Sequence, residues 1–159
     1  PFHLTRLLPL TTVSLVLLMI APALAHHPTG SKIPSNFVEG FLSGLAHPVI
    51  GFDHFAFVVA VGLLAATKRQ GILITIAFVL SAMAGTGLHL IGFSLPGAEL
   101  LISGSVLLFG VLLVLRDSPS TSLIMILVAL AGICHGYAYG EAIFGASMAP
   151  LLAYLLGFT

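Results

Sequence analysis

Polar residues fall in short clusters that separate long apolar runs. After a turn-rich polar stretch at 26–36, the apolar runs extend over 37–66, 71–93, 97–115 and 122–144, and a fifth begins near 148. Each of the four complete runs is long enough to cross about 30 Å of hydrocarbon as a helix. The runs are unbroken and lack alternation with a period of two, so strands are not expected. The pattern predicts an all-α, polytopic transmembrane helix bundle with at least five membrane-crossing segments.

The start of the chain has the layout of a secretory signal peptide. Arg6 precedes an apolar stretch that ends in the small-residue sequence Ala23-Leu24-Ala25. We expect residues 1–25 to be either a signal peptide cut after Ala25 or an uncleaved first transmembrane helix. The chain does not begin with Met and ends soon after an apolar run starts, so the transmembrane domain at 26–159 is expected to lack its C-terminal part.

Composition supports a membrane protein. Hydrophobic residues make up 58% of the 159 residues and charged residues 6%, and the mean hydropathy is +1.18. A soluble domain of this size could not keep so much apolar surface out of water, so lipid is the expected solvent for its outer surface. Five basic and five acidic residues give a formal net charge of zero, which argues against a nucleic-acid partner. The single cysteine, Cys134, is expected to be a small buried hydrophobe.

Basic residues predict the orientation of the helices. If the polar stretch before the first run is outside, the connections after the first and third runs fall inside, and they hold Lys68, Arg69 and Arg116. The opposite connections, around Pro96-Gly97 and Gly145, hold no basic residue. This distribution satisfies the positive-inside rule. The expected location is a bacterial inner (cytoplasmic) membrane or a comparable internal membrane.

Ionisable residues inside the apolar runs mark the candidate site. A charged group at mid-membrane costs roughly 2.5–3.5 kcal/mol on insertion scales, so its presence usually reflects function. The candidates are His47, Asp53, His54, His89, Glu99, His135 and Glu141. On the predicted topology they gather in the outer half of the membrane, which indicates a cavity that opens to the outside.

The segment GLAHPVIGFDH carries three of these candidates. His47 and His54 are seven residues apart, so an unbroken helix would place them on one face about 10 Å apart. Pro48 and Gly51 lie between them, and local unwinding there would shorten the gap. Asp53 and His54 point about 100° apart on a helix and could line a cavity from two directions.

Nitrogen and oxygen donors of this kind suit a transition metal. Imidazole with carboxylate favours Ni²⁺, Co²⁺, Zn²⁺ or Cu²⁺ over Mg²⁺ or Ca²⁺, and does not decide among the four. His135 and Glu141 are six apart, on neighbouring helix faces. His89 alone is more simply a hydrogen-bonded helix contact, and Glu99, near the interface, could be solvated or begin a helix. A haem-binding electron carrier is a further alternative if His54 and His135 lie on facing helices.

Glycines at four-residue spacing predict close helix packing in lipid. They form two ladders, Gly40 with Gly44, and Gly132 with Gly136 and Gly140.

Two motifs resemble a known family. HPVIGFDH (47–54) resembles the HPxxGxDH signature of the HupE/UreJ family of nickel/cobalt permeases, which are associated with hydrogenase or urease metallation. HGYAYGE (135–141) resembles that family's HG…E segment. The resemblance covers essentially the whole chain, and family members usually have about six helices after the signal. It implies that 26–159 is a metal-permease domain, with no enzymatic activity and no tightly bound cofactor.

The resemblance implies secondary transport of Ni²⁺ or Co²⁺ from the outside, supplying metal for metalloenzyme maturation, without an ATPase. It implies that His47, Asp53 and His54 select and pass the metal and that His135 and Glu141 contribute from another helix.

Other features leave alternatives open. His26 and His27 would form a first docking point for metal at the outer surface if cleavage follows Ala25. The expected partners are a divalent transition metal ion, the lipid bilayer, and an oligomer or a larger membrane complex. The alternative function is a non-transporting, permease-like subunit packed in such a complex.

Overall fold

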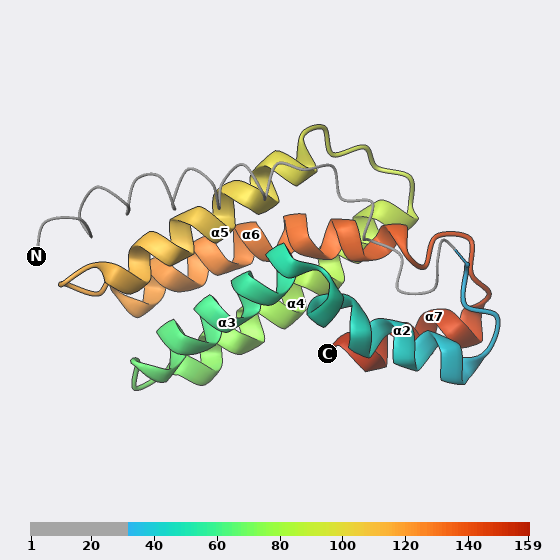
Figure 1. The fold of residues 1–159 in the computed structure, drawn as a ribbon, viewed down its shortest axis with the longest axis horizontal. Helices are drawn as coiled ribbons and strands as arrows, with labels where there is room; N and C mark the ends of the chain where they lie inside the picture. The colour runs from blue at the N-terminus through green and yellow to red at the C-terminus, as the bar shows by residue number, and fades with distance from the viewer. Residues whose placement is uncertain (1–31) are drawn as a thin grey trace, which may run out of the picture.

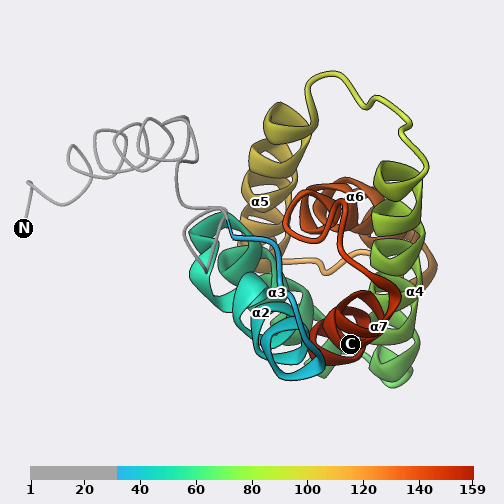
Figure 2. The ribbon, with the colours of Figure 1, turned by 90° about the vertical axis from the view of Figure 1, so that its right-hand side faces the viewer.

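Helices make up all the regular structure in residues 32–159, the part of the chain that the computed structural model describes. They are α2 (Phe37–Ile50), α3 (Phe52–Ala66), α4 (Gly71–Leu90), α5 (Ala98–Val114), α6 (Thr121–Glu141) and α7 (Met148–Phe158). α6 lies between α4 and α5, and α3 runs alongside this group (Figures 1 and 2). α2 pairs with the short α7 beyond the end of α3 (Figure 1).

Two of these helices are long and apolar enough to cross a membrane, α4 with 20 residues and α6 with 21. α2 and α3 meet the same criterion as a pair, bent by 78° at the break between them, so the described residues hold two or three candidate spans. α5 and α7 are shorter apolar helices of 17 and 11 residues. The predicted all-helical class is confirmed for residues 32–159. The count of five or more crossings stays a prediction, and the signal-like segment 1–25 lies outside the described residues.

The outer surface of the helices is apolar, as a lipid-facing surface should be. Ile72, Leu100 and Val114 are 68%, 76% and 80% exposed, which water would penalise and hydrocarbon tails do not. The interior is packed with fully buried side chains such as Phe57 and Phe109. Cys134, expected to be buried, is only partly so. Its position on α6 lines an apolar groove next to α5, which explains the difference.

The predicted glycine ladders lie at helix contacts. On α2, a Cβ at Gly40 or Gly44 would overlap the carbonyl oxygen of Pro150 or Tyr154 on α7. On α6, the nearest neighbours of such a Cβ are Ser81 Oγ at Gly132, the Ala82 carbonyl oxygen at Gly136 and the His89 side chain at Gly140, all on α4. Such close approach gives dispersion contacts that hold helices together where lipid removes the hydrophobic drive.

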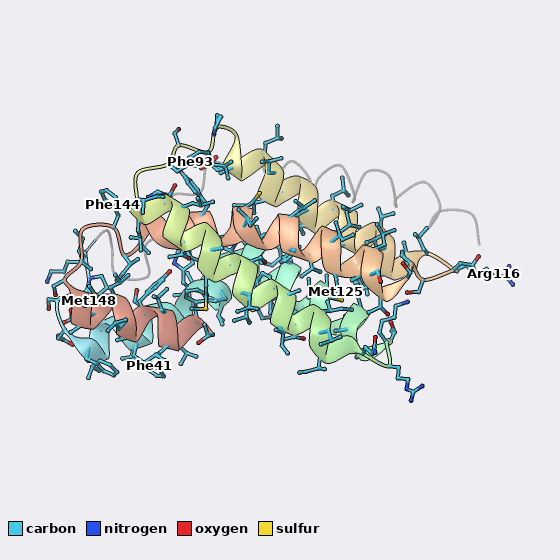
Figure 3. The ribbon with its side chains drawn as sticks, turned by 180° about the vertical axis from the view of Figure 1, so that it is seen from behind. Phe41, Phe93, Arg116, Met125, Phe144 and Met148 are labelled. Atoms are coloured by element: carbon cyan, nitrogen blue, oxygen red, sulfur yellow. The ribbon has the colours of Figure 1, made fainter. Side chains whose placement is uncertain are left out.

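The basic connections lie together at one end of the helices. The α3–α4 and α5–α6 connections lie at the same end of the helices in Figure 1, and the Lys68 ammonium joins them by donating to the Pro119 carbonyl oxygen. In Figure 3, Arg116 lies at this end, whereas Phe93 and Phe144 lie toward the other. The division of charge between the ends is the one that the sequence predicts.

Candidate functional site

A helix break brings two histidines close together. Pro48 cannot donate a helix hydrogen bond, and Gly51 has an extended backbone (φ −70°, ψ 106°) that ends α2 and precedes α3. The unwinding predicted between the histidines is therefore present. It brings the ring centroids of His47 and His54 to 5.5 Å, about half the separation on a straight helix.

A third histidine enters from α6. The Nδ1 atoms of His54 and His135 are 2.7 Å apart, within hydrogen-bonding distance. The other ring nitrogen of His135, Nε2, lies 2.9 Å from Ser105 Oγ on α5. The ring of Phe57 stacks on His135 with centroids 4.1 Å apart and planes inclined by 23°. His47 is 2% exposed, and His54 and His135 are 0% exposed, so the three form a cluster shielded from the surroundings.

Tyrosines close one side of this histidine cluster. The ring of Tyr139, one turn after His135 on α6, lies edge-on to His47 and His54 at centroid distances of 5.0 and 4.7 Å. Tyr154 on α7 holds this part of α6 because its hydroxyl donates to the Tyr139 carbonyl oxygen at 2.9 Å. The Tyr139 hydroxyl is itself buried and has no hydrogen-bond partner within residues 32–159.

Asp53 supplies negative charge next to the cluster. Its side chain is half-buried, and Oδ1 accepts a hydrogen bond from the backbone N–H of His54 at 2.8 Å. The carboxylate thus satisfies a donor in the first turn of α3, where a negative charge is also favoured by the helix dipole. Within residues 32–159, no set of three or more His, Cys, Asp or Glu residues is arranged to hold a metal ion together.

Comparison with known proteins identifies the family. Residues 14–159 match the profile of the family described as HupE / UreJ protein. The chain belongs to the HupE/UreJ family. It is 30% identical over 139 residues to the protein HupE of Rhizobium leguminosarum bv. viciae, a match that covers 86% of this chain and 69% of that protein. No solved structure matches the chain. The family that the two motifs indicate is therefore confirmed.

Only some residues of the two motifs of this HupE/UreJ protein lie close together in the structure. The cluster contains both histidines of the first motif and His135 of the second, but Glu141, the last residue of α6, is exposed. Glu99 is also exposed. His89 lies apart from the cluster, half-buried at the end of α4 with its ring 4.6 Å from that of Tyr137. His26 and His27 lie outside the described residues.

The distance between the ring nitrogens of His54 and His135 tests the haem alternative. Metal–nitrogen bonds are about 2.0–2.1 Å long, so two nitrogens bound to opposite sides of one ion lie roughly 4 Å apart. The Nδ1 atoms of His54 and His135 are 2.7 Å apart, which is a hydrogen-bonding distance with no room for iron. These two nitrogens do not form an axial pair for a haem.

Sequence reasoning did not single out Ser105, Tyr139 or Tyr154. Tyr139 could have been found, because it lies four residues after His135 and therefore on the same face of one helix. Ser105 and Tyr154 lie on other helices, and nothing in the sequence indicates that they approach the cluster.

Proposed function

We propose that this chain carries Ni²⁺ or Co²⁺ from the outside across a bacterial inner membrane, or a comparable internal membrane, as a secondary transporter that supplies metal for metalloenzyme maturation. The observation that carries the proposal is the convergence of His47, His54 and His135 inside a set of apolar helices. Membership of the HupE/UreJ family supports it.

The chemistry of the cluster suits this cargo. Imidazole nitrogen binds Co²⁺ and Ni²⁺ well, whereas the hard ions Mg²⁺ and Ca²⁺ prefer oxygen. A divalent ion that leaves water needs donors to replace part of its hydration shell and negative charge to offset the cost of entering a medium of low dielectric constant. His47 and His54 provide the nitrogen donors, and Asp53 provides the charge.

The membrane potential supplies a sufficient driving force. Moving one elementary charge through 100 mV is worth about 2.3 kcal/mol, so a divalent cation gains about 4.6 kcal/mol on moving inward. This corresponds to a concentration ratio of more than a thousandfold. Uptake therefore needs no nucleotide hydrolysis, although coupling to protons would add to the gradient.

Uptake of radioactive nickel into proteoliposomes, with and without an imposed potential that is negative inside, tests the proposal. We expect potential-dependent uptake by the wild type. His47→Ala and His54→Ala should abolish it at an unchanged amount of membrane protein. His89→Ala serves as a control and should cost less, because His89 lies outside the cluster. Purified wild-type protein that gives no flux of nickel or cobalt would instead favour the non-transporting subunit of a larger complex.

A further inference from the structure

Ser105 links the histidine cluster to the backbone of α5. Its Oγ atom lies 2.7 Å from the Ile102 carbonyl oxygen and 2.9 Å from His135 Nε2. A serine hydroxyl has one proton to donate, and a carbonyl oxygen can only accept. For both contacts to be hydrogen bonds, the proton must go to Ile102, and the Ser105 oxygen then accepts a hydrogen bond from Nε2–H of His135.

This arrangement determines the tautomers of both bonded histidines. The two rings are completely buried, which favours their neutral forms over a charge in a medium of low dielectric constant. A neutral His135 with its proton on Nε2 has a lone pair on Nδ1. That lone pair accepts from His54 Nδ1–H across the 2.7 Å contact. His54 consequently has its own lone pair on Nε2.

We propose that Ser105 is a positioning residue that acts through His135 to hold His54 in the tautomer whose Nε2 lone pair can bind the transported metal ion. This inference rests on the proposed function and adds a role for α5 that neither motif contains. His135 then orients His54 as the metal ligand. Metal-binding histidines are commonly oriented in this way, by a group that forms a hydrogen bond with the second ring nitrogen.

Loss of the Ser105 oxygen has a defined consequence. Without an acceptor at Nε2, His135 can move its proton to Nδ1, and two N–H groups would then face each other at the contact with His54. Relief of that clash shifts the His54 proton to Nε2, where it blocks metal binding. Groups that support metal ligands typically contribute 10- to 100-fold to affinity, so we expect Ser105→Ala to raise the apparent KM for nickel uptake about tenfold.

The chain offers two matched variants. Ser105→Thr keeps the hydroxyl oxygen and adds one methyl group at a residue that lines the apolar groove of about 310 Å³ between α5 and α6. Ser81 on α4 makes the same kind of hydrogen bond three residues back along its helix, to the Phe78 carbonyl oxygen at 2.9 Å, but bonds no histidine within residues 32–159. Ser81→Ala therefore controls for loss of a hydroxyl from an apolar helix.

Solid-state NMR of the full-length protein in bilayers, with ¹⁵N- and ¹³C-labelled histidine, reads the tautomers directly. The wild type should show His135 protonated on Nε2 and His54 protonated on Nδ1. Ser105→Ala should introduce the opposite tautomer of both rings, whereas Ser105→Thr and Ser81→Ala should retain the wild-type pattern. A wild-type spectrum with His135 protonated on Nδ1 would overturn the proposal, and this result does not depend on how any variant folds.

Uptake kinetics complete the test. The apparent KM should rise in Ser105→Ala, recover in Ser105→Thr and stay unchanged in Ser81→Ala. An unchanged KM in Ser105→Ala, together with altered tautomers, would overturn the link between tautomer and metal binding. Failure of the proposed function is distinguishable, because the wild type would then transport no metal while its nitrogen spectrum would still show the assigned tautomers.

Discussion

His47 and His54 lie on two different helices with ring centroids 5.5 Å apart, although a single apolar run contains both. A straight helix would separate them by about 10 Å. The 78° bend between α2 and α3 makes the difference. The break at Gly51 therefore determines how closely His47 and His54 approach each other, and His54 also lies within hydrogen-bonding distance of His135.

The first prediction concerns this break. Gly51→Ala should reduce metal uptake by about tenfold or more, the scale of a misplaced metal ligand. The backbone at Gly51 tolerates alanine, but an added Cβ would come within 2.6 Å of His54 Cδ2 and 3.3 Å of Asp53 Oδ1. The His54 ring would have to move. Uptake of radioactive nickel at matched expression measures the effect.

Gly62→Ala is the matched control for that substitution. Gly62 lies on α3, and a Cβ there would meet nothing within 4 Å, so this variant should transport normally. Wild-type uptake by Gly51→Ala would show that the cluster does not require the present position of His54.

The second prediction separates the charge of Asp53 from its hydrogen bond. Asp53→Asn retains an oxygen that can accept from the His54 backbone N–H, so α3 should begin as before. The negative charge is lost, and with it the compensation for a dehydrated divalent cation. We expect uptake to be abolished while the amount of protein in the membrane is unchanged.

Asp53→Ala should add a folding defect, because it removes the acceptor of the His54 backbone N–H, and a lost hydrogen bond typically costs about 0.5–1.5 kcal/mol. Thermal unfolding of both variants in detergent distinguishes the two effects. Near-normal uptake by Asp53→Asn at matched expression would remove the role of charge and favour the packing-subunit alternative.

The helical class could be predicted because it follows from apolar run lengths and from the absence of alternation. The bend inside 37–66 was predictable as well, since Pro48 and several glycines interrupt that run. Its size was not predictable, because a proline and a glycine permit a break without setting the angle between the two halves. Composition also cannot distinguish a crossing helix from a shorter apolar one such as α5.

The candidate site was predictable within each helix and less so between helices. Spacing shows that His135 and Glu141 point in different directions, and the structure buries the first and exposes the second. Which face of α6 meets α3 depends on tertiary packing, and so does the approach of Ser105 from α5. A serine in an apolar run carries no signal that distinguishes it from one such as Ser81, whose hydroxyl bonds a carbonyl oxygen of its own helix.

The third prediction concerns the buried hydroxyl of Tyr139. An unsatisfied buried polar group costs roughly 1–3 kcal/mol, so Tyr139→Phe should leave thermal stability unchanged or increase it. We expect uptake to fall nonetheless. The ring that carries the hydroxyl contacts His47 and His54, so the hydroxyl can form a hydrogen bond with a water molecule of the partly hydrated metal ion. One hydrogen bond of about 0.5–1.5 kcal/mol corresponds to a decrease of about two- to tenfold.

Tyr154→Phe provides the contrast. It removes a hydrogen bond to the Tyr139 carbonyl oxygen, so it should lower the free energy of unfolding by about 0.5–1.5 kcal/mol. Transport rates and melting temperatures of the two variants measure both effects. Full activity in Tyr139→Phe would limit that residue to a packing role.

The fourth prediction concerns orientation. The end of the molecule that carries Lys68, Arg69 and Arg116 should face the cytoplasm, because short basic connections are retained on that side. Single cysteines introduced by Gln70→Cys and Pro96→Cys test this without removing a positive charge, in a Cys134→Ala background that leaves no other cysteine. Both positions are exposed. In intact spheroplasts, an impermeant maleimide should label position 96 and should reach position 70 only after lysis. Labelling of position 70 in intact spheroplasts would reverse the topology, and the side from which metal enters the histidine cluster would have to be reversed with it.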